Sequence, residues 1–118
     1  MAQGKSSDLP YATILQKGSA LIVPNTTLTT ILTFTNTSDI LWFEGFNGSG
    51  EIDAEYTLVI NTILKMSLMS SEQNRYVQHF FGVPGMRIEI GDIIDIKVQH
   101  FNTVVTGDFH ASLWGTRR

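Results

Sequence analysis

The sequence predicts an all-β fold, a single antiparallel β-sandwich of about eight or nine strands. β-Branched and aromatic residues are abundant, and apolar positions never recur at helical spacing over three turns. Instead, apolar and polar residues alternate, most clearly in residues 86–90 and 94–100. The 118 residues suit one domain with one core, divided by turn-forming residues into short segments.

Two hairpins are expected from the turn signals. The segments 86–90 and 94–100 flank Gly91 and Asp92, and glycine tolerates the positive φ of a tight turn. The segments 54–60 and 64–68 flank a second turn at residues 61–62. The other expected strands cover residues 19–23, 29–36, 40–46, 76–81 and 108–114, and the remaining turns and loops cover 24–25, 36–39, 47–50, 70–74 and 82–85.

Alternation also predicts which side chains face the core. In the segment 29–36, Thr30, Leu32 and Phe34 are expected on one face. The segment 40–46 is too apolar for simple alternation, so we expect a central strand covered by the core on one face and by a neighbouring subunit or loop on the other. A jelly roll fits this arrangement best, because such a chain must close or pair its sheet edges. The expected core includes Leu58, Met66, Ile88, Ile96 and Val98.

Residues 1–11 are predicted to form a flexible arm ahead of a sandwich domain at 12–118. The arm has no apolar run, so we expect neither a signal peptide nor an anchor, and synthesis in the cytoplasm. Without secretion, the sequons at Asn25, Asn36 and Asn47 are interpreted as turn chemistry rather than glycosylation sites. We expect the arm to be dispensable for folding but needed for attachment to a partner.

Composition excludes several classes of protein. The chain has no cysteine, which excludes disulfide scaffolds, thiolate metal sites and cysteine nucleophiles. Its net charge of -3 gives no electrostatic attraction to nucleic acid or to anionic lipid. Its 42% hydrophobic residues are interrupted too evenly for a membrane span. We therefore expect no nucleic-acid or membrane partner.

Four carboxylates, those of Glu44, Glu51, Asp53 and Glu55, surround the segment 47–50 and are candidate Ca²⁺ ligands. Their spacing matches no EF-hand loop, and a solvated sheet face would give the same pattern. The expectation is that they bind no metal.

The histidines, His79, His100 and His110, lie on three separate predicted strands. His100 has the parity of a core position and His110 the opposite parity, which argues against a shared zinc site. The sequence contains no nucleophile-elbow, phosphate-binding or dinucleotide-binding motif. We therefore expect no catalytic, cofactor-binding or metal-binding residue and no enzymatic activity.

Aromatic residues suggest an interaction surface. Trp42 and Phe43 are adjacent, so in a strand they point to opposite faces, and one must lie outside the core. A covered outer face favours oligomerisation, and the interface candidates are Trp42, Phe43, Phe46 and Trp114. The alternative is that exposed aromatic rings stack on a glycan.

The segments LWFEGFNGSGEIDAEY (41–56), SEQNRYV (71–77) and GDIIDIKV (91–98) resemble small β-sandwich structural proteins of tailed bacteriophages. The resemblance implies a non-enzymatic virion protein, first of all a head-decoration or cement protein that binds the major capsid protein, or another virion protein, and stabilises the head lattice. It further implies a homotrimer located in the virion. The alternative is a carbohydrate- or receptor-binding module of a tail or fibre, and a third interpretation is a small β-barrel enzyme. The resemblance leaves the head or tail location open.

Overall fold

The structure, a computed structural model, describes residues 12–22 and 28–117. The predicted arm at 1–11, the turn at 24–25 and the sequon residue Asn25 lie outside these residues. Within them, no helix is long and apolar enough to cross a membrane. The described residues form nine strands: β1 (Ala12–Ile22), β2 (Thr29–Thr35), β3 (Leu41–Gly50), β4 (Ala54–Ile60), β5 (Ile63–Met69), β6 (Tyr76–Phe80), β7 (Met86–Ile88), β8 (Ile93–His100) and β9 (Gly107–Arg117).

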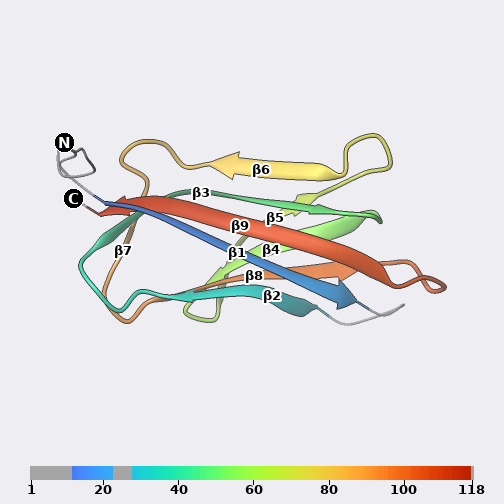
Figure 1. The fold of residues 1–118 in the computed structure, drawn as a ribbon, viewed down its shortest axis with the longest axis horizontal. Coiled ribbons are helices and arrows are strands. Elements are labelled where there is room, and N and C mark those ends of the chain that lie inside the picture. The colour runs from blue at the N-terminus through green and yellow to red at the C-terminus, as the bar shows by residue number, and fades with distance from the viewer. Residues whose placement is uncertain (1–11, 23–27, 118) are drawn as a thin grey trace, which may run out of the picture.

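The strands form two antiparallel sheets that pack face to face (Figure 1). One sheet has the order β1-β9-β3-β6, with β7 also paired to β3, and the other has the order β2-β8-β4-β5. Among the nine strands of the described residues, most connections cross from one sheet to the other, and only β4 and β5 are both consecutive and paired. This is the strand order of a jelly roll, so the predicted fold class is confirmed.

Alternation of apolar residues places the core between the sheets. In β8, Ile94, Ile96 and Val98 are buried, while the residues between them are half-buried on the opposite face. Leu58 and Ile88 are also buried as predicted. Met66 is only half-buried, because β5 is an edge strand whose side chains have neighbours on one side only.

The predicted hairpin between residues 86–90 and 94–100 is wrong. β7 pairs with β3 in one sheet, whereas β8 lies between β2 and β4 in the other. Gly91 does adopt the positive φ of a turn residue, 95°, but the turn it forms is a corner between the sheets. Alternation fixes the buried face of each segment and says nothing about which strand it pairs with.

The predicted hairpin between β4 and β5 is confirmed. Its turn residues Asn61 and Thr62 both have positive φ, 52° and 67°. The Asn61 side chain donates a hydrogen bond to Asp92 (2.8 Å) and accepts one from the backbone N–H of Ile93 (2.9 Å). The hairpin is thereby tied to the corner that precedes β8.

The segment 47–50, predicted as a turn, belongs instead to β3. A Cβ on Gly48 would lie 2.3 Å from a ring carbon of Tyr56, and one on Gly50 would lie 2.3 Å from a ring carbon of Phe109. These glycines therefore make room for core rings that pack against the backbone of β3. Tyr56 itself is fully buried.

An irregularity in β2 changes the predicted side-chain faces. The register with β8 shifts between Thr30 and Leu32, so Ile31 and Leu32 are both buried. Thr30 is exposed and does not share the buried face of Leu32, and Phe34 is half-buried. Such a bulge reverses the parity of the residues before it.

Candidate interaction surface

The four predicted interface residues separate into two pairs. Phe43 and Phe46 are fully buried between the sheets, so in the folded chain they offer no surface to a partner and are core residues. Trp42 and Trp114 are half-buried and lie on the other face of the β1-β9-β3-β6 sheet, which we call the outer face. A bulge between Phe43 and Gly45 lets β3 present both phenylalanines to the core.

An apolar band crosses the outer face. Leu15 of β1 pairs with Trp114 of β9, Trp114 pairs with Gly45 of β3, and Gly45 pairs with Phe80 of β6. Residues directly opposite one another in neighbouring strands point to the same face, so Leu15, Trp114 and Phe80 form one row, which we call the outer band. Leu15 is 56% exposed and Phe80 is 54% exposed.

Gly45 makes room for the Trp114 ring at the centre of the outer band. A Cβ at Gly45 would come within 2.5 Å of the Trp114 ring, so the ring occupies the space above this glycine. Trp42 lies one row further along β3, with the guanidinium of Arg87 6.0 Å from its ring centroid. The Thr116 hydroxyl beside it donates to Glu44 (3.0 Å).

Polar side chains border the outer band. Along β3 and β9, the Ser112 hydroxyl donates to Asn47 Oδ1 (2.6 Å), and Asn47 Nδ2 donates to the Tyr76 hydroxyl (3.2 Å). Tyr76 in turn bonds to Gln78. An apolar centre with a hydrogen-bonding margin is the usual anatomy of a protein-protein contact.

The acidic residues lie apart rather than in one cluster. Residues 51–53 form the connection between β3 and β4 and not a strand, so Glu51, Asp53 and Glu55 do not share a sheet face. The Glu51 carboxylate accepts a bond from the backbone of Asp108 (2.9 Å), and Asp53 pairs with Arg75 (2.8 Å). Within the described part of the chain, no three candidate metal ligands gather.

His100 and His110 occupy the faces predicted from their phases. His100 is buried and stacks on Phe109, with ring centroids 5.5 Å apart, whereas His110 is exposed beside Asp108. His79 is half-buried and packs edge-on against Phe81. The three rings therefore do not converge.

Sequence reasoning missed two of the three residues in the outer band, Leu15 and Phe80. The predicted strand 19–23 left Leu15 out, because no pattern in the neighbouring sequence indicated that β1 begins at Ala12. Phe80 fell in a predicted strand, but its pairing with Gly45 depends on strand order.

Comparison with models of protein families, with curated proteins and with solved structures finds no significant match.

Proposed function

We propose that this chain is a non-enzymatic structural protein of a bacteriophage particle, a head-decoration protein that binds the capsid lattice. In this proposal it self-associates through the outer band as a homotrimer. The observation that carries the association is the row of Leu15, Trp114 and Phe80, which crosses four strands with two of its side chains more than half exposed.

Burial of the outer band supplies a driving force for association. Fully burying a Leu or Phe side chain is worth about 1.5–3 kcal/mol, so covering half of one is worth about 1 kcal/mol. Each subunit contributes such side chains, and the summed free energy of their burial opposes the loss of translational and rotational freedom on association. The polar border around Asn47 adds hydrogen bonds that give the contact its orientation.

The virion location is supported by the resemblance of residues 41–56, 71–77 and 91–98 to phage structural proteins. A decoration protein adds contacts between shell subunits and needs adhesive surfaces rather than a reaction centre. The outer face meets that need, because three of its strands present apolar side chains in one row.

Self-association is tested by light scattering after size exclusion at micromolar concentration. The unmodified chain is expected near three times its mass of 13.1 kDa. Leu15→Lys and Phe80→Lys each place a charge in the outer band and should shift the mass to that of the monomer. Leu64→Lys is the matched control, because Leu64 is 62% exposed but lies on β5 of the other sheet, and it should leave the mass unchanged. A monomeric unmodified chain, or equal loss in all three variants, would contradict the proposal.

The virion assignment has its own test. Mass spectrometry of purified particles of the phage that encodes the chain should find it on the heads. Deletion of its gene should lower the temperature at which those heads release DNA. Heads of unchanged heat stability, or recovery of the chain from tails only, would refute the decoration role.

A further inference from the structure

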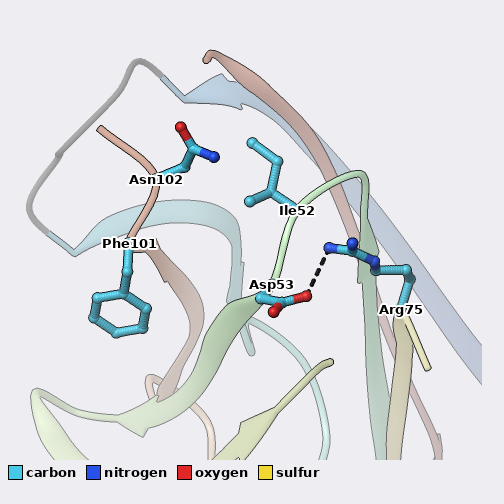
Figure 2. Close-up of a pocket in the computed structure, with 5 residues that line it drawn as sticks. All are labelled: Ile52, Asp53, Arg75, Phe101 and Asn102. Atoms are coloured by element: carbon cyan, nitrogen blue, oxygen red, sulfur yellow. Dashed lines mark ion pairs between the residues drawn. The ribbon is translucent and has the colours of Figure 1, made fainter. Parts of the chain in front are cut away.

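A cavity of about 320 Å³ opens at one end of the sandwich. Three connections line it, as Figure 2 shows: Ile52 and Asp53 between β3 and β4, Arg75 between β5 and β6, and Phe101 and Asn102 between β8 and β9. A volume near 300 Å³ is at the lower limit for small-molecule sites, so it suits one ring with its substituents.

The charges in the cavity compensate each other. Arg75 Nη1 lies 2.8 Å from Asp53 Oδ1, and the side chains remain 37% and 54% exposed. The paired guanidinium and carboxylate give the cavity no net charge, which disfavours both a free anion and a metal ion. They still offer hydrogen-bond donors and acceptors to a neutral ligand.

Asn102 presents a positioned donor. Its backbone N–H donates to His100 Nδ1 (3.3 Å), and its Oδ1 accepts from the backbone N–H groups of Val104 (2.8 Å) and Val105 (2.9 Å). These bonds use the side-chain oxygen and leave Nδ2 without a bond to another described residue. In Figure 2 that nitrogen points toward Ile52, into the space between the labelled residues.

Apolar surface completes the site. Phe101 is 58% exposed at its rim, and Ile52 is half-buried at the side facing Asn102. An exposed aromatic ring beside polar groups suits a ligand that is apolar on one face and carries hydroxyls at its edge. A pyranose ring has this character, because its axial C–H groups form an apolar face.

We propose that this cavity binds the terminal residue of a neutral saccharide. Asp53 accepts hydrogen bonds from ring hydroxyls, Arg75 and Asn102 donate to their oxygens, and Phe101 packs against the C–H face. This goes beyond the proposed structural role, since it gives the same chain a second surface that recognises a glycan.

The experiment uses the full chain displayed on beads, so that many weak contacts add, against an array of neutral and acidic glycans. Asn102→Asp keeps the oxygen that holds Val104 and Val105 but removes the Nδ2 donor, and Phe101→Ala removes the stacking ring. Val104→Ala is the control, because Val104 is 81% exposed on the same connection and does not line the cavity. Thermal melting of each variant establishes that it is folded.

Glycans that end in a neutral hexose should bind, the control should bind equally, and both test variants should bind at least tenfold more weakly. Binding confined to acidic glycans would overturn the assignment of a neutral ligand. Binding that survives both Asn102→Asp and Phe101→Ala, or no binding by the unmodified chain, would overturn the site. The oligomeric state is measured separately, so the two proposals fail independently.

Discussion

The Asn36 side chain joins three segments at one end of the sandwich by hydrogen bonds, and its substitution is a quantitative test of the fold. The side chain is fully buried just after β2. The two hydrogens of its Nδ2 group are shared among the carbonyl oxygens of Asp39 (3.1 Å), Ile88 (3.3 Å) and Glu89 (3.1 Å), and its Oδ1 accepts from Arg117 (2.8 Å). One amide therefore joins the β2–β3 connection, the corner after β7 and the end of β9.

Asn36→Ala removes all four of these bonds. The Ile88 carbonyl lies in a buried contact, and an unsatisfied buried acceptor costs about 1–3 kcal/mol. The bond from Arg117 is charge-assisted, partly buried and worth about 1.5 kcal/mol, while water can replace the bonds to Asp39 and Glu89. The expected loss is about 3 kcal/mol of unfolding free energy, which lowers Tm by about 12 °C for a chain of this length.

Urea unfolding followed by tryptophan fluorescence measures this loss, provided that the denaturant slope m is unchanged. Thr33→Ala is the control, because the Thr33 hydroxyl also donates a hydrogen bond, to the side chain of Asp95 (2.6 Å), but on the exposed face of β2 and away from the outer band. Its loss should stay below about 1 kcal/mol, since water replaces the partner groups. If Asn36→Ala costs no more than Thr33→Ala, the reasoning from burial is refuted.

Two further predictions concern the core. Ile96→Asp buries an unpaired charge at a fully buried position, so it should lower the unfolding free energy by at least about 4 kcal/mol or prevent folding. Lys97→Asp lies on the other face of β8 and should lower it by less than about 1 kcal/mol, and equal melting temperatures of the two variants would show that the register is wrong. Burial raises the pKa of Tyr56 to about 12 from its ordinary 10.0. The stability that comes from the neutral form of Tyr56 is therefore complete below pH 10 and is lost as the pH rises through 12, and the total loss of unfolding free energy is about 2–3 kcal/mol. Among the described residues, the Tyr56 hydroxyl has no partner in hydrogen-bonding geometry, although Ser70 is near enough to lower its pKa slightly. Tyr56→Phe should therefore keep the stability at pH 7 and reduce the alkaline loss. Urea midpoints that fall in parallel for both proteins between pH 9 and pH 11 would contradict this.

Local patterns predicted which residues are buried. Ile96, Val98 and His100 have the parity of buried positions, and all three are buried in β8. The same parity placed His110 outside and is confirmed in β9. These predictions succeed because the side-chain direction alternates with every residue and needs no knowledge of the neighbouring strand.

Strand pairing could not be predicted in the same way. A Gly-Asp connection closes a hairpin in one context and turns a corner between sheets in another, and the outcome at Gly91 depends on where β3 offers a free edge to β7. Gly48 and Gly50 looked like turn residues because the sequence does not show that the rings of Tyr56 and Phe109 lie against them.

The interaction surfaces depend on such long-range contacts. The bulge beside Gly45 moved Phe46 into the core, and the pairing of Leu15 with Trp114 created the outer band. Asp53 was interpreted as one of four clustered acids, but its partner Arg75 comes from another connection. No local sequence signal brings together residues from three separate connections.

The hydrogen bonds of Asn36, Asn61 and Asp92 lie at one end of the sandwich, and the cavity lies at the other end. At the end that holds Asn36, one carboxylate oxygen of Asp92 accepts a hydrogen bond from Asn61 and the other accepts one from the backbone N–H of Glu89. These bonds lower the pKa of Asp92. Each of its two oxygens thereby accepts a hydrogen bond from within the chain.

The outer band and the cavity are also separate from each other. A Cβ on Gly107, at the start of β9, would touch the Ile52 side chain of the cavity, whereas Trp114 of the outer band lies seven residues further along the strand. At about 3.4 Å per residue, Gly107 and Trp114 lie about 24 Å apart along β9, whereas Arg75 of the cavity lies five residues, about 17 Å, from Phe80 of the outer band. A partner that covers the outer band therefore leaves the cavity open, and Leu15→Lys should abolish self-association without changing the affinity of a single site for a saccharide.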